Sequence, residues 1–122
     1  MAVAPISLVG KSIEWTGFHH SPSGDFTELS THTVTYVSEG RCYVTANGKH
    51  VGDAHYVYRR MDDRMGIVIY RPEVYQGRRD VTLHAMFDFA EGTDRAVILA
   101  AGEPFAVANG RMRDVPTPTF AG

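Results

Sequence analysis

Asp53 and His55 are the side chains whose types and spacing best suit acid–base chemistry. They stand two residues apart in an extended, aromatic-rich segment, and alternate residues of a β-strand share one face. In apolar surroundings, desolvation raises the pKa of a carboxyl toward neutral pH, and a neighbouring histidine can orient it or relay its proton. We therefore predict Asp53 and His55 as catalytic residues. In the alternative, Asp53 binds backbone amides after Gly52, and His55 is an ordinary strand histidine.

Arg71 is a candidate anchor for an anionic substrate. It lies between Tyr70 and Pro72, at the expected mouth of a strand. Its planar guanidinium could hold a substrate carboxylate through two parallel hydrogen bonds. The alternative is a surface arginine that pairs with Glu73 or Asp80.

Neither a metal centre nor a cofactor is expected. His19 and His20 are adjacent, and adjacent side chains of an extended chain point in opposite directions, so they cannot chelate one ion together. No pair of potential ligands has a recognised zinc spacing. Cys42 is the only cysteine, which excludes an intramolecular disulfide and favours a reducing compartment.

The composition is that of an ordinary soluble domain. The chain has 122 residues, 43% hydrophobic residues and a net charge of −2, which gives no electrostatic footprint for nucleic acid or an anionic membrane. The opening segment has neither the charged region nor the apolar stretch of an export signal. We expect a cytoplasmic protein whose partner is a small molecule.

These candidate residues belong to short segments rich in Val, Ile, Thr, Tyr and Phe that are separated by glycine-centred turns, a pattern typical of β-strands. Asn47-Gly48 is the strongest hairpin signal. The expected strands are 11–18, 26–37, 41–46, 51–60, 66–71, 80–89, 95–100 and 105–109. Eight such strands predict an all-β, antiparallel, up-and-down barrel of the calycin or lipocalin type, with an interior cavity for one ligand. A cone-shaped α+β fold would need N-terminal helices, and no 3.6-residue period precedes Phe26.

The domain organisation is expected to be simple. Residues 1–110 are predicted to form one barrel domain. Residues 111–122 are predicted to form an extended tail, because Pro116 and Pro118 cannot donate ladder hydrogen bonds. This tail could cover a barrel end or a partner subunit, and in the second case the protein would be a homodimer.

Alternation predicts which side chains face inward. Trp15 shares the apolar face of the first strand and should point inward, where an indole can pack, stack or donate a hydrogen bond. Leu83 lies on a plainly apolar face of the sixth strand. For the strand that contains Tyr43, both faces are possible. We predict Trp15, Tyr43, Tyr70, Arg71 and Leu83 as substrate-binding residues.

Four segments carry a resemblance to known proteins: Leu8–Trp15, residues 47–58 with a Gly-x-x-x-Gly turn, Gly66–Pro72, and Asp80-Val81-Thr82-Leu83. Their order resembles the calycin-type barrels of the MoaF family and the phenolic acid decarboxylases, over roughly two-thirds of the chain. The resemblance implies that Trp15, Asp53, His55 and Tyr70 face the cavity, and that Tyr43 joins them.

The resemblance also bears on the reaction. Where the decarboxylases have an arginine after the second glycine and a glutamate before the proline, this chain has Asp53 and Arg71; MoaF-type sequences carry an aspartate at the first position. We predict a cofactor-independent lyase or isomerase that uses proton transfer on a small aromatic or unsaturated organic acid. The alternatives are a non-catalytic carrier or sensor of a small ligand and an accessory protein.

Overall fold

The computed structural model describes residues 3–21, 24–25, 29–75 and 77–119, and these residues form strands without any helix. None of them therefore belongs to a helix that could span a membrane. The strands are β1 (Ser12–Ser21), β2 (Gly24–Asp25), β3 (Ser30–Ser38), β4 (Arg41–Ala46), β5 (Lys49–Arg60), β6 (Met65–Pro72), β7 (Val81–Asp88), β8 (Thr93–Ala100) and β9 (Glu103–Val115).

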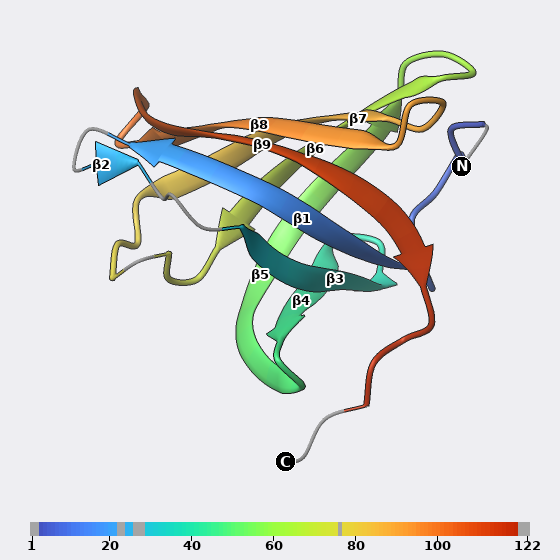
Figure 1. Ribbon diagram of the computed structural model, residues 1–122, viewed down its shortest axis with the longest axis horizontal. Coiled ribbons are helices and arrows are strands. Elements are labelled where there is room, and N and C mark those ends of the chain that lie inside the picture. The colour runs from blue at the N-terminus through green and yellow to red at the C-terminus, as the bar shows by residue number, and fades with distance from the viewer. Residues whose placement is uncertain (1–2, 22–23, 26–28, 76, 120–122) are drawn as a thin grey trace.

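The strands close into an eight-stranded antiparallel barrel, as predicted. From β3 to β9, consecutive strands pair with each other. β1 pairs with both β3 and β9, which closes the barrel. The closing ladder runs from Ser12 opposite Val115 to His20 opposite Val107, and β1 and β9 lie side by side along their length (Figure 1). The short β2 is an additional hairpin arm on β1. Closure satisfies the edge groups that an open sheet of this length would expose.

The Asn47-Gly48 hairpin is confirmed. Both residues have positive φ, 53° and 74°, as a type I′ turn requires. The turn joins β4 to β5, whose register shifts between Val44 and Thr45.

The C-terminal strand is longer than predicted. Residues Arg111–Val115 belong to β9 and pair with β1, so a tail boundary at residue 111 is wrong. The prolines end the strand, because Pro116 follows the last paired residue directly. The predicted tail therefore begins after Val115.

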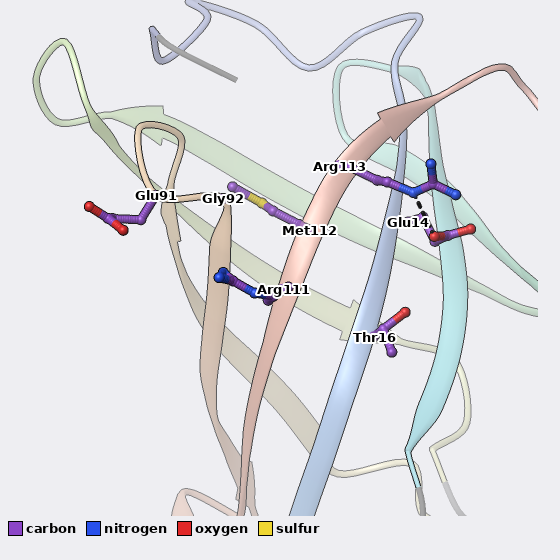
Figure 2. A pocket seen from close by; sticks show the side chains of 7 residues that line it. All are labelled: Glu14, Thr16, Glu91, Gly92, Arg111, Met112 and Arg113. Atoms are coloured by element: carbon purple, nitrogen blue, oxygen red, sulfur yellow. Dashed lines mark hydrogen bonds and ion pairs between the residues drawn. The ribbon is translucent and has the colours of Figure 1, made fainter.

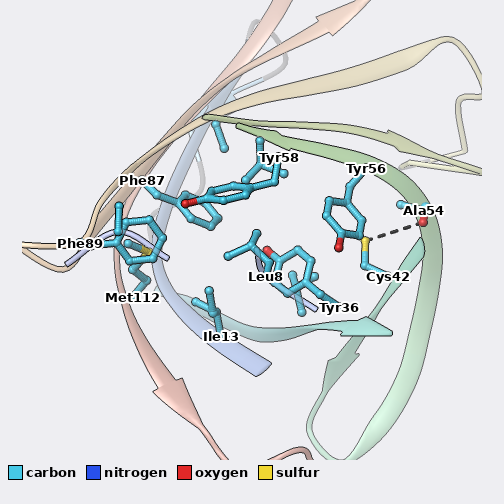
Figure 3. Packing of buried hydrophobic residues seen from close by; sticks show 14 residues of the cluster. Leu8, Ile13, Tyr36, Cys42, Ala54, Tyr56, Tyr58, Phe87, Phe89 and Met112 are labelled. Carbon is cyan, nitrogen blue, oxygen red and sulfur yellow. Dashed lines mark hydrogen bonds between the residues drawn. The ribbon is translucent and has the colours of Figure 1, made fainter. Parts of the chain in front are cut away.

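The N-terminal segment covers one end of the barrel. Leu8 is fully buried within the core cluster, where Figure 3 shows it among aromatic rings, and Ala4 is also buried. The Ala4 amide donates to the Asp63 carbonyl at 2.7 Å, and the Tyr58 hydroxyl donates to the Pro5 carbonyl at 2.5 Å. Buried side chains of Phe87, Phe89 and Met112 complete this layer. We call this the closed end, and the end where β1 finishes and β3 begins the far end.

Candidate functional site

The two predicted catalytic residues lie on the outer face of the barrel. Along β5, Ala54, Tyr56 and Tyr58 take the buried positions, while Asp53 is half-buried and His55 is exposed. The expectation that Asp53 and His55 face the interior is therefore wrong. The physical reason is that only one of the two alternating faces of β5 can point inward. The face with Tyr56 and Tyr58 buries far more apolar surface than the face with Asp53 and His55.

Asp53 contacts a histidine other than the predicted one. Its carboxylate lies 3.1 Å from Nε2 of His50, and both side chains are substantially exposed, at 41% and 38%. The Tyr43 ring lies 6.0 Å from the His50 ring on the same outer surface, so Tyr43 is also outside the barrel.

Arg71 does not reach the interior either. It is exposed on β6, opposite the exposed His55 of β5. Of its predicted partners, Asp80 is instead bound by Arg78, with two hydrogen bonds of 3.0 Å. An arginine in this position cannot anchor a ligand inside the barrel.

Trp15, Tyr70 and Leu83 do face inward, as alternation predicted for Trp15 and Leu83 and as the resemblance implied for Tyr70. Tyr70 and Leu83 are paired across β6 and β7. Trp15 is 4% exposed, and its indole N–H donates to the backbone carbonyl of Asp94 at 3.0 Å. The indole thereby ties β1 to the inner surface of β8.

Two glycines make room for this indole. Gly17 of β1 and Gly110 of β9 are opposite each other in the closing ladder. A Cβ at either position would overlap the Trp15 ring. Glycine is therefore required here for close packing.

The structure brings Tyr70 together with Tyr36, a residue that sequence reasoning did not select. Their hydroxyl groups hydrogen-bond to each other. In this bond one hydroxyl donates its proton and the other accepts. The accepting hydroxyl can still donate its own proton to another group. Burial raises the pKa of both phenols well above the usual value, so both are protonated at neutral pH. The Tyr56 ring packs edge-on against Tyr36, with ring centres 5.0 Å apart.

Asp94 is the second unpredicted member of this cluster. It lies on the inner face of β8, in register with Phe87 and Gly110. Desolvation raises the pKa of its carboxyl to about 7. Its charge also contributes to the raised pKa of both Tyr36 and Tyr70, which places the three groups within electrostatic reach of one another. Among the described residues, none gives the carboxyl a hydrogen bond or an ion pair.

The sequence signal for Asp94 was weak. In Thr93–Ala100, one alternate set holds Asp94, Ala96 and Ile98, while the other holds Val97 and Leu99, so both faces look apolar. The predicted strand also began at residue 95, which left Asp94 in a turn. Tyr36 carried a clearer signal, because it alternates with Val34 in β3.

Two histidines flank Trp15 toward the far end of the barrel. The His32 ring stacks on the indole at 5.1 Å, and the His19 ring lies 5.0 Å from it. Burial lowers the pKa of His19 and brings that of His32 to about 4. Both imidazoles are therefore uncharged at neutral pH.

Cys42 is not arranged as a nucleophile. Its thiol is buried, lies 3.7 Å from the Ala54 carbonyl as a weak donor, and has its pKa raised by burial to about 12. A thiol rather than a thiolate is unreactive at neutral pH. In the described part of the chain, no group of three or more His, Cys, Asp or Glu could hold a metal ion.

An open groove of about 350 Å³ lies on the outside, along β1 and β9 (Figure 2). Glu14 accepts a hydrogen bond of 2.9 Å from Arg113 across it. The other lining residues are Thr16, Glu91, Gly92, Arg111 and Met112. Its mixed charges and openness give it no feature of a catalytic centre.

Comparison with known proteins supports the fold. No protein-family model and no curated protein matches the chain. A solved structure from Burkholderia vietnamiensis, described as a "putative beta-lactamase", matches with a TM-score of 0.60 and 20% identity, over 92% of this chain and 100% of that one. At this identity, the likeness shows a shared barrel fold.

Proposed function

We propose that the barrel binds a small aromatic or unsaturated organic molecule in its interior and catalyses a cofactor-independent proton transfer, as a lyase or an isomerase. The observation that carries the proposal is the cluster of Asp94, Tyr36 and Tyr70. An inward-facing carboxyl that receives no hydrogen bond or ion pair from the described residues lies there within electrostatic reach of two protonated phenols. Such groups are characteristic of sites at which protons are moved.

Uneven burial supports a ligand chamber around this cluster. At the closed end, Leu8, Phe87 and Phe89 are covered almost completely. In contrast, Asp94 and Tyr70 face inward and are yet only half-buried, as are Leu83 and His32. We infer that these incompletely covered, inward-facing residues line the ligand chamber.

The proposed step uses Asp94 as the base. Its carboxylate takes a proton from a carbon next to the substrate carbonyl, and the electron pair of that C–H bond moves to the carbonyl oxygen to form an enolate. A hydroxyl of the Tyr36–Tyr70 pair donates a hydrogen bond to this oxygen, where negative charge develops. Asp94 then returns the proton to the same carbon or, in a conjugated substrate, to a different carbon, which completes exchange or isomerisation.

The acidity of Asp94 suits this role. A general acid–base group works best when its pKa lies near the working pH, because both protonation states are then available. The raised pKa of about 7 meets that condition. The phenols remain protonated and act only as donors.

Other likenesses support a small-molecule role without defining the reaction. The resemblance to the MoaF family and the phenolic acid decarboxylases points to a ligand within the barrel. The decarboxylase pair is replaced here by Asp53 and Arg71 on the outer face, so we assign the proton transfer to Asp94 instead. Because the Burkholderia vietnamiensis structure is described as a "putative beta-lactamase", a β-lactam is included among the compounds tested.

The test is deuterium uptake. Purified protein without added cofactor is incubated in deuterated water with phenolic, unsaturated and carbonyl compounds and a β-lactam, and the products are analysed by mass spectrometry. We expect catalysed exchange or a new product with the wild type and with Asp53→Asn, and its loss in Asp94→Asn. Binding without exchange or product would replace the proposal by the non-catalytic carrier.

A further inference from the structure

The basic side chains all lie away from the proposed chamber. Every arginine of the chain and Lys49 are exposed. Lys11 is half-buried just before β1, at the closed end, where its backbone bonds to Leu8 and Tyr36. None of these cations is positioned to meet an anion near Asp94.

The histidines do not supply the missing charge. His32 and His19 flank Trp15, and burial favours the neutral form of both, with a further contribution from His20 at His19 and from His19 at His32. The remaining polar groups of the cluster are phenols, which donate hydrogen bonds but carry no positive charge. The inner surface near Asp94 is therefore neutral or negative.

An anionic ligand would meet two penalties in this environment. It would lose its hydration without gaining a counter-charge, which is costly in a low-dielectric interior. It would also be repelled by the Asp94 carboxylate whenever that group is ionised. A carbonyl oxygen, in contrast, needs only a hydrogen-bond donor, and the Tyr36–Tyr70 pair retains one proton to donate.

We propose that the ligand of this barrel is an uncharged carbonyl compound, such as a ketone, an aldehyde or an ester, and not a free carboxylic acid. This inference rests on the proposed function and narrows its substrate class. It replaces the organic acid expected from Arg71, because that arginine lies outside the barrel.

Benzylacetone and hydrocinnamate provide a matched test, since they differ mainly in a methyl group in place of a carboxylate oxygen. Trp15 is the only tryptophan and lies against Asp94, so its fluorescence reports binding inside the barrel. At pH 8, we expect benzylacetone to bind at least about tenfold more tightly, a difference of about 1.4 kcal/mol. The Asp94→Asn variant should narrow the gap by improving hydrocinnamate binding.

Deuterium exchange measured on the same samples separates the two proposals. Equal or tighter binding of hydrocinnamate to the wild type would overturn the substrate class, while exchange in either compound would uphold proton transfer. Tighter binding of benzylacetone with no exchange would overturn the proposed reaction and leave a carrier of uncharged ligands. Absence of binding by both compounds would overturn both proposals.

Discussion

Two aspartates of this barrel, Asp53 on β5 and Asp94 on β8, have opposite environments. Asp53 lies outside, is 41% exposed and is paired with His50 at 3.1 Å. Asp94 lies inside, has no hydrogen bond or ion pair among the described residues, and has its pKa raised to about 7 by desolvation. The same side chain is a solvated surface group in one place and a candidate proton carrier in the other.

The difference comes from strand parity. One residue separates Asp53 from Ala54, yet Ala54 faces the core and Asp53 does not. At Asp94, burial opposes the ionised form of the carboxyl. Chemistry in a barrel of this kind is therefore decided by the inner set of each strand.

The largest expected effect is that of Asp94→Asn on proton transfer. The amide keeps the size of the side chain but cannot accept a proton as a carboxylate does. We expect exchange to fall by about 10²–10⁴-fold, the usual contribution of a general acid–base group. Mass spectrometry gives the rate, and circular dichroism checks that the barrel is intact. A folded Asp94→Asn variant with full activity would contradict the assignment.

Tyr70→Phe should have the next largest effect. It removes one hydroxyl of the pair that is proposed to stabilise the enolate, so we expect a loss of about a hundredfold in the exchange rate. Tyr43→Phe makes the same change on the outer face and serves as the matched control. Equal losses in the two variants would show that the effect is not specific to the interior.

His32 makes the barrel sensitive to acid. Its pKa of about 4 in the folded protein lies below the unfolded value of 6.5. As the pH falls from 6.5 to 4, the unfolded chain therefore takes up a proton on this histidine before the folded protein does. The contribution of His32 to stability is therefore lost between about pH 6.5 and 4, by up to about 3 kcal/mol. Asp94 acts in the opposite direction over a similar range, because its pKa is raised.

The difference between the wild type and His32→Phe isolates the histidine contribution. Urea unfolding at several pH values should show a smaller acid loss in His32→Phe, in which the aromatic packing on Trp15 is kept. His55→Phe, at an exposed position, should leave the acid loss unchanged. A wild-type acid profile in His32→Phe would disprove the role of His32.

Gly110→Ala tests the packing of Trp15, whose indole N–H binds the backbone carbonyl of Asp94. The added Cβ would overlap the indole, and overpacking of this kind costs about 1–3 kcal/mol. We expect a lower urea midpoint and altered Trp15 fluorescence. At Gly52, which has open space around its Cβ position and no positive φ, Ala should produce neither change. Unaltered fluorescence in Gly110→Ala would contradict the packing described.

Asp53→Asn should have the smallest effect. Exposed ion pairs typically contribute about 0–1 kcal/mol, so both stability and exchange should stay close to those of the wild type. Urea unfolding and the deuterium assay measure the two quantities. A large loss of exchange in this variant would restore the outer pair as the reactive site.

Local pattern predicted the barrel well and the site only in part. β-branched and aromatic runs with Asn47-Gly48 between two of them define strands and turns by short-range chemistry, which the sequence displays directly. The inward positions of Trp15 and Leu83 followed from clear alternation. Asp53 was assigned to the wrong face on the family resemblance, because both sets of β5 contain aromatic or apolar residues and alternation could not choose between them.

The rest depended on contacts between distant segments. Leu8 covers the closed end only once the barrel has formed. The hydrogen bond between Tyr36 and Tyr70 likewise forms only when the barrel closes. Asp94 owes its raised pKa to burial by several strands, which no local pattern encodes.

Carboxyl-carbon NMR of the aspartates across a pH titration tests the central claim most directly. The resonance that disappears in Asp94→Asn identifies the residue. The interior site predicts a midpoint of about 7 for Asp94. A midpoint near the ordinary value of about 3.9 would show a solvated or partnered carboxyl and would contradict the proposed proton carrier.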